Sequence, residues 1–168
     1  AVPNLGTDWG RHTMTVAFNI ITYAGYGLLL AAMIAYAALK GIKTSARQGV
    51  VWGFCGFVAV QLAPAIGLPP ELPGTIGPEV GSRQIWWLFT IVATSIGIGL
   101  IAFGRGYLTL ASIPIIALPQ LIGAPQLDVF FGVAPPELAA EFVTLSLGCA
   151  AAGWVILGYT VSAMLFRL

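Results

Sequence analysis

The chemically capable side chains of this sequence are few, and their types suit the binding of a divalent metal ion. The chain has one histidine, His12, and carboxylates at Glu71 and Glu141. Borderline divalent metals accept imidazole and carboxylate ligands. We therefore predict His12, Glu71 and Glu141 as candidate metal ligands, with Co²⁺ or another divalent metal ion as the species they would hold.

The motifs of the common enzyme classes are missing from the sequence. It contains no Gly-rich phosphate loop, zinc-protease helix, CxxC pair or Ser/His/Asp arrangement. We therefore do not expect an enzyme.

Composition places the chain in a membrane. Hydrophobic residues make up 58% of the 168 residues and charged residues only 8%, which is typical of an integral membrane protein. The net charge of +1 gives no field that would attract nucleic acid, so no nucleic-acid partner is expected. We predict a single transmembrane domain over residues 1–168 in a lipid bilayer, as a multi-pass protein of the bacterial inner (cytoplasmic) membrane.

The apolar stretches predict an all-α fold with five transmembrane helices. These spans cover approximately residues 13–39, 48–66, 84–103, 107–122 and 137–166. The second and fourth spans are expected to be short and proline-bent, because Pro64 lies in one and Pro114 and Pro119 lie in the other. None of the spans carries a charged residue near its middle, so we expect a neutral lining and no buried proton relay.

Cation placement predicts the orientation. Most basic residues fall on one side of the expected membrane, and only Arg11 and Arg83 share the other side with the acids. The first group consists of Lys40, Lys43, Arg47, Arg105 and Arg167. The positive-inside rule then predicts an N-out, C-in topology. A start on the outer side without Met suggests that a preceding hydrophobic segment has been removed or is not included.

Several polar side chains are expected near the outer surface on this topology. Asn19, Gln61, Gln120 and Glu137 could line one shallow pocket together with the candidate metal ligands. Each also has a simpler explanation. Amides form hydrogen bonds between membrane helices, and carboxylates at a helix start complement the helix dipole.

A proline-rich corner at residues 61–74 is the least generic stretch of the chain. Its prolines remove backbone donors and fix φ, so the helix should end there in a rigid, extended lip that carries one acid, Glu71. Parts of this stretch recur later in the chain: QL at 61–62, IG at 66–67 and PPEL at 69–72 resemble QLIG at 120–123 and PPEL at 135–138. The similarity suggests an internal repeat, for which chance is an equal explanation.

Aromatic residues mark candidate interfaces. Trp86 and Trp87 are expected in an aromatic belt at the headgroup level, and Phe130 and Phe131 form an apolar loop that a partner could cover.

Four blocks of sequence resemble the signature blocks of the CbtA family, proposed subunits of a cobalt transporter. They are LAPAIGLPPELPG at 62–74, SRQIWW at 82–87, LPQLIGAP at 118–125 and PELAAEF at 136–142. The resemblance implies a small multi-span membrane protein that takes part in cobalt transport. It also implies one further hydrophobic segment at the N-terminus.

The same resemblance implies that this chain has fewer metal-binding side chains than the family commonly has. Histidine is common in the family where this chain has Gln120 and Gln61, and in the loop that here reads DVFFG at 128–132. An amide oxygen is a poorer ligand than imidazole for a borderline transition metal.

Two functional hypotheses follow. The first is a CbtA-like component of a transporter for cobalt or another divalent metal, gated by the bent second and fourth spans. The second is a non-catalytic accessory subunit of a larger respiratory or photosynthetic membrane assembly. Both hypotheses predict another membrane protein subunit as a partner.

Overall fold

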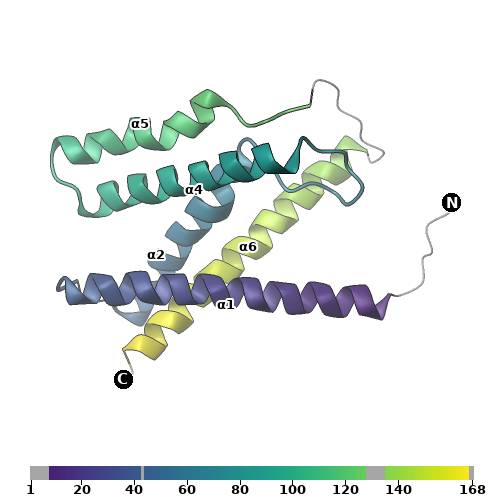
Figure 1. The fold of residues 1–168 in the computed structure, drawn as a ribbon. Helices are drawn as coiled ribbons and strands as arrows, with labels where there is room; N and C mark the ends of the chain where they lie inside the picture. Colours follow the sequence, from purple (N-terminus) through teal and green to yellow (C-terminus); the bar gives the residue numbers. More distant parts are fainter. Residues whose placement is uncertain (1–7, 43, 128–134, 167–168) are drawn as a thin grey trace.

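The regular structure of the described chain is entirely helical (Figure 1). The computed structural model describes residues 8–42, 44–127 and 135–166. The elements in order are α1 (Trp9–Leu39), α2 (Ala46–Phe57), the π-helix η1 (Val58–Leu62), α3 (Ala63–Ala65), α4 (Val80–Phe103), α5 (Tyr107–Ile122) and α6 (Pro136–Leu165). The predicted all-α fold is confirmed.

The helix lengths fit five spans, one of them short. Four helical runs, 9–39, 46–65, 80–103 and 136–165, are long and apolar enough to cross a membrane. The run at 46–65 combines α2, η1 and α3. With 16 residues, α5 reaches only about 24 Å at 1.5 Å per residue, less than the roughly 30 Å of a hydrocarbon core.

Three helices begin earlier than hydropathy predicts, because polar residues cap them. Asp8 accepts a hydrogen bond from the Arg11 amide, so α1 begins at Trp9 instead of residue 13. Ser45 and Gln48 form a reciprocal capping box at the start of α2. Glu79 accepts from the Ser82 amide, and α4 begins at Val80. Caps of this kind satisfy the orphan amides of a helix start with side-chain oxygens, which apolar periodicity does not reveal.

The second span is irregular where it approaches Pro64. This proline has no N–H to give to the carbonyl of Val60, so the regular α-helical ladder cannot pass through it. The preceding turn widens into the π-helix η1, whose end is marked by the Ala63 amide donating to the Val58 carbonyl. By contrast, α5 stays helical through Pro114 and Pro119 and ends at Ile122, before Gly123, whose φ is +85°.

The tightest contact in the fold joins α2 to α6. Gly49 and Gly53 are buried, and a Cβ at Gly53 would overlap the carbonyl oxygen of Trp154. A Cβ at Gly49 would overlap the carbonyl of Gly158 and the side chain of Ser162. The four-residue spacing of Gly49 and Gly53 places both glycines on the face of α2 that approaches α6, where small residues allow close helix packing.

An aromatic cluster extends this contact to α1. Phe57, Ala150 and Trp154 form its buried centre, and the Tyr26 ring stacks on Trp154 at a centroid distance of 4.8 Å. The buried residues of α1, Gly27, Leu30, Ile34 and Ala37, all belong to its second half. The first half, residues 9–21, is exposed along its whole length, which suits contact with lipid or with another subunit.

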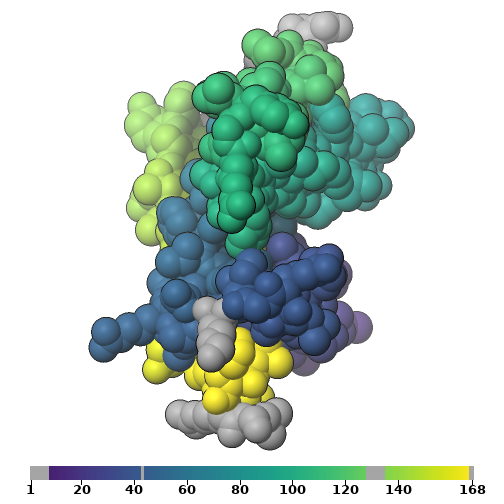
Figure 2. Space-filling view, turned by 90° about the vertical axis from the view of Figure 1, so that its left-hand side faces the viewer, coloured from purple at the N-terminus to yellow at the C-terminus, as the bar shows by residue number. Residues whose placement is uncertain are grey.

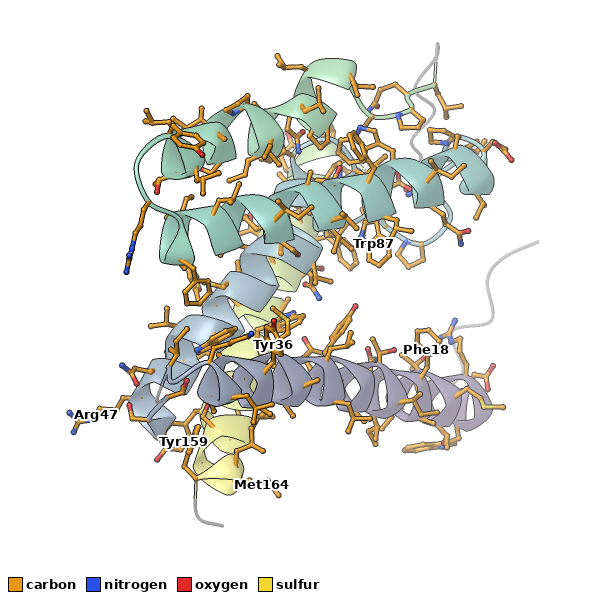
Figure 3. All side chains as sticks on the ribbon, turned by 60° about the vertical axis from the view of Figure 1, so that its left-hand side comes forward. Phe18, Tyr36, Arg47, Trp87, Tyr159 and Met164 are labelled. Atoms are coloured by element: carbon orange, nitrogen blue, oxygen red, sulfur yellow. The ribbon has the colours of Figure 1, made fainter. Side chains whose placement is uncertain are left out.

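The helices alternate in direction, so the two ends of the bundle differ (Figure 1). One end holds the α1–α2 connection, the start of α5 and the end of α6. Figure 2 looks onto this end, with α4 and α5 in one lobe and α1 with the C-terminal part of α6 in the other. Arg47 projects outward from this end (Figure 3), whereas Lys43 and Arg167 lie outside the described residues.

The N-out, C-in orientation stays a prediction that fusion reporters can test. We expect green fluorescent protein fused after Leu168 to fluoresce in cells, because the C-terminus should be cytoplasmic. We expect alkaline phosphatase inserted after Gly74 to be active, because that loop should face outward. The reverse pattern of the two reporters would show that the orientation is inverted.

The close approach of α2 and α6 predicts that a single methyl group at Gly53 destabilises the protein. The Gly53→Ala side chain would meet the Trp154 backbone, which cannot rotate away, and overpacking of this kind costs about 1–3 kcal/mol. We expect a lower melting temperature in detergent. Gly148→Ala is the matched control on α6, since a Cβ there meets nothing within 4 Å. Equal melting temperatures for both variants would contradict the close contact.

Candidate functional site: a groove at the proline corner

A groove lies where the second span ends, between the proline corner and the first turns of α4. Its volume is about 410 Å³. Pro64, Leu68, Pro69 and Pro70 form one wall, and Val80 and Trp87 contribute to the opposite side. The polar side chains of the groove are Gln61, Glu71, Arg83 and Gln84. Most of the wall is therefore apolar, with a few polar groups at defined places, as in many ligand sites.

An ion pair crosses the groove. The Nη2 atom of Arg83 lies 3.1 Å from Oε2 of Glu71, and both side chains are about 30% exposed. Arg83 comes from the first turn of α4, whereas Glu71 comes from the corner, which has no regular secondary structure after Ala65. The predicted end of the helix at the corner is thus confirmed. The pair brings together two charges twelve residues apart.

Two glutamine side chains that follow Pro119 in the chain donate hydrogen bonds to the backbone of the corner. The Nε2 atom of Gln120 donates to the carbonyl of Ala63 at 2.9 Å, and Nε2 of Gln126 donates to the carbonyl of Gly67 at 2.9 Å. A helix leaves its last carbonyls without intrahelical donors. Gln126 supplies a donor to such a carbonyl at Gly67, whereas Gln120 adds a second donor to the carbonyl of Ala63, which also accepts from the Ile66 amide.

Trp86 completes this arrangement from α4. Its indole Nε1 donates to the carbonyl of Pro119 at 3.0 Å in a buried hydrogen bond. The ring also packs on Gly67, where a Cβ would lie 2.7 Å from both Trp86 Cη2 and Ala124 Cβ. These contacts therefore hold the corner, α4 and the end of α5 together.

The predicted metal ligands are not gathered into one cluster. Within the described residues, no group of three or more His, Cys, Asp or Glu side chains is placed to hold a metal ion. His12 is exposed in the first turn of α1, and Glu141 is exposed near the start of α6. Of the predicted ligands, Glu71 is the one that lines the groove.

The predicted pocket-lining residues have different positions. Gln61 lines the groove, whereas the Gln120 amide is used in the hydrogen bond to Ala63. Asn19 is exposed on α1 and donates to the carbonyl of Thr15, one turn earlier in its own helix, at 3.0 Å. Glu137 is exposed in the first turn of α6. The structure therefore brings Gln61 and Glu71 into one groove and leaves Asn19 and Glu137 outside it.

The aromatic interface residues also divide. Trp86 is only 5% exposed, so its expected place in a belt at the headgroup level is wrong. Its indole N–H is buried inside the chain, where it donates to the carbonyl of Pro119. Trp87 is 38% exposed and lies on the side of α4 away from α5 (Figure 3), next to the groove. Phe130 and Phe131 lie outside the described residues.

Three residues of this region were not singled out as site residues by the sequence. Arg83 and Gln84 line the groove, and Gln126 holds the corner. The sequence did predict that Arg83 and Glu71 lie on the same side of the membrane, where an ion pair between them is possible. No sequence pattern identified the carbonyl that each glutamine would meet.

The groove offers oxygen donors. The carboxylate of Glu71 and the amide oxygens of Gln61 and Gln84 are hard ligands, and no imidazole or thiol lines the groove. Such ligands suit divalent ions that keep part of their water shell. Because Arg83 is paired with Glu71, the groove carries no net charge, so these oxygens can coordinate a cation only weakly.

Comparison with protein families gives one match that covers nearly the whole chain. The family model described as probable cobalt transporter subunit (CbtA) matches residues 3–166. The match extends well beyond the blocks in which the resemblance was seen. No curated protein and no solved structure gives a significant match.

The role of Gln120 can be tested by its stability effect. Gln120→Leu removes a part-buried hydrogen bond to the corner, and we expect a loss of about 1 kcal/mol in stability and a lower melting temperature. Gln84→Leu is the matched control, because no hydrogen bond of its side chain is found within the described part of the chain. If the Gln120→Leu variant has a melting temperature no lower than that of the control, the hydrogen bond from Gln120 to Ala63 does not stabilise the corner.

Proposed function

Because this chain belongs to the CbtA family of probable cobalt transporter subunits, we propose that it is a membrane-embedded component of a transporter for cobalt or a similar divalent cation. The observation that carries the proposal beyond the family is the groove at the proline corner. There, a carboxylate and two amides meet at the end of an interrupted membrane helix. We place the protein in the bacterial cytoplasmic membrane.

The position of the charges supports a cation route that begins at this groove. Within the described helices, Asp, Glu, Lys and Arg are confined to the first two turns. Glu71 therefore stands at the entrance of a neutral interior. A single carboxylate can concentrate cations at an entrance, whereas a buried carboxylate in the middle of a span would hold them strongly.

The ligand types support weak, reversible binding. Amide and carboxylate oxygens exchange readily with water around a divalent ion, and Co²⁺ accepts such ligands although it binds imidazole better. A site of this kind would release its ion easily, which a transporter requires. In this proposal the chain passes on an ion that it holds only briefly.

The irregular second span supplies a place for movement. π-helical turns occur frequently at functional sites, and interrupted helices mark the binding regions of many transporters. In this chain η1 runs into Pro64 and contributes Val60 and Gln61 to the groove. We propose that η1 is the adaptable wall of the groove, while the corner behind it is fixed by Gln120 and Gln126.

A second membrane subunit would complete the pathway. The short α5 and the uncovered first half of α1 leave apolar surface that another membrane protein could cover, and the family is described as a transporter subunit. The alternative, an accessory subunit of a respiratory or photosynthetic assembly, receives no support from the comparisons.

Cobalt uptake by cells tests the proposal. We expect expression of the protein, with its native neighbours in the membrane, to raise the accumulation of radiolabelled Co²⁺. Glu71→Gln should raise the half-saturating concentration by about tenfold, since contacts to a charged group contribute about 1.5 kcal/mol or more.

Glu137→Gln is the control for that experiment. It makes the same charge change on an exposed residue that does not line the groove, and we expect it to leave uptake unchanged. Uptake that responds equally to both substitutions, or to neither, would refute a specific role for the groove. Membrane levels of each variant should be measured on the same cells.

A further inference from the structure

We propose that the Arg83 guanidinium is a tethered competitor of the transported cation at Glu71. In this role Arg83 occupies the carboxylate when no metal ion is present and must be displaced before an ion can bind. The inference rests on the proposed function, because the ion that competes with Arg83 is the transported metal ion.

The geometry of the ion pair suits displacement. Arg83 contacts Glu71 through one hydrogen bond, from Nη2 to Oε2 at 3.1 Å, instead of the two parallel bonds of a bidentate pair. Both side chains remain about 30% exposed within the groove. A dissolved cation can therefore reach the carboxylate without unfolding any element.

The loop above the pair leaves room for the guanidinium. A Cβ built on Gly77 would overlap Arg83 Nη1 and lie 3.2 Å from Glu71 Oε2. The φ of Gly77 is not positive, so glycine is needed here for space and not for its backbone conformation. Gly77 thus keeps the Arg83 guanidinium in its place beside Glu71.

Competition of this kind lowers the apparent affinity for every cation by the same factor. Arg83 carries a single positive charge that is held next to Glu71 at a high effective concentration. A divalent ion interacts about twice as strongly with the carboxylate as a monovalent ion does. The divalent ion therefore displaces Arg83 at a lower concentration, and this preference comes from the charge of Glu71 and not from the competition itself.

The rival interpretation is a purely structural ion pair that ties the corner to α4. The two roles predict opposite results when the arginine is removed. A structural tie would disorder the groove and weaken metal binding, whereas a competitor would free the carboxylate and strengthen it.

Calorimetric titration of the purified full-length protein in detergent with Co²⁺ distinguishes these roles. We expect Arg83→Gln to bind Co²⁺ roughly two- to fivefold more tightly than the unmodified protein, the range that follows from the weakness of exposed ion pairs. Arg83→Lys keeps the charge and should bind like the unmodified protein. Glu71→Gln should lose the binding in either background.

Gly77→Ala provides a second variant that keeps both charges. Its methyl group would push the flexible end of Arg83 aside, so we expect tighter Co²⁺ binding in this variant also, which secures the test if Arg83→Gln fails to fold.

The outcomes separate the inference from the proposed function. If Co²⁺ binds in a Glu71-dependent way but neither Arg83→Gln nor Gly77→Ala tightens it, the competitor role is refuted and the metal site stands. If no Glu71-dependent binding occurs in any folded variant, the groove is not a metal site, and both proposals fail.

Discussion

Side-chain hydrogen bonds to backbone carbonyls around the proline corner are the interactions on which the rest of the structure depends. The second span ends at Ala65, just after Pro64, which has no N–H to donate. Gln126 donates to the carbonyl of Gly67, and Gln120 donates to the carbonyl of Ala63, which also accepts from the Ile66 amide. Trp86 donates to the carbonyl of Pro119 at the end of α5, which also accepts from the Gly123 amide. These three bonds hold the ends of the second span, α4 and α5 together and thereby fix one side of the groove.

The other side of the groove is formed by η1 and the ion pair. The π-helix η1 contributes Val60 and Gln61 to the groove, and Glu71 and Arg83 form the ion pair. In the function that we propose, these parts serve as an adaptable wall and an exchangeable counter-ion beside a fixed frame, at a site that binds an ion and releases it. Gln120 belongs to this frame and not to the groove lining.

Packing elsewhere divides the molecule into a tight part and an open part. Gly49 and Gly53 bring α2 against α6 at backbone contact, and Trp154 stacks on Tyr26 of α1 beside this contact. On the N-terminal side of Tyr23, the first half of α1 extends away from the other helices and is exposed. Lipid would cover such a helix, as would the second subunit that a transporter of this family implies.

The sequence by itself determined the membrane class, the five helical spans, the interruption at Pro64 and the family, because hydropathy, proline and short signature blocks are local properties of the chain. Helix starts were displaced by up to four residues, since caps such as Asp8 and Glu79 depend on single side-chain hydrogen bonds. Only the tertiary structure decided which polar residues meet. Positions 120 and 61 are both glutamine, yet the Gln120 amide joins two helices by a hydrogen bond, whereas the Gln61 side chain lines the groove. Trp86 and Trp87 are adjacent, yet one is buried and the other borders the groove. Successive residues of a helix point in different directions, and what each of them meets depends on segments far away in the chain.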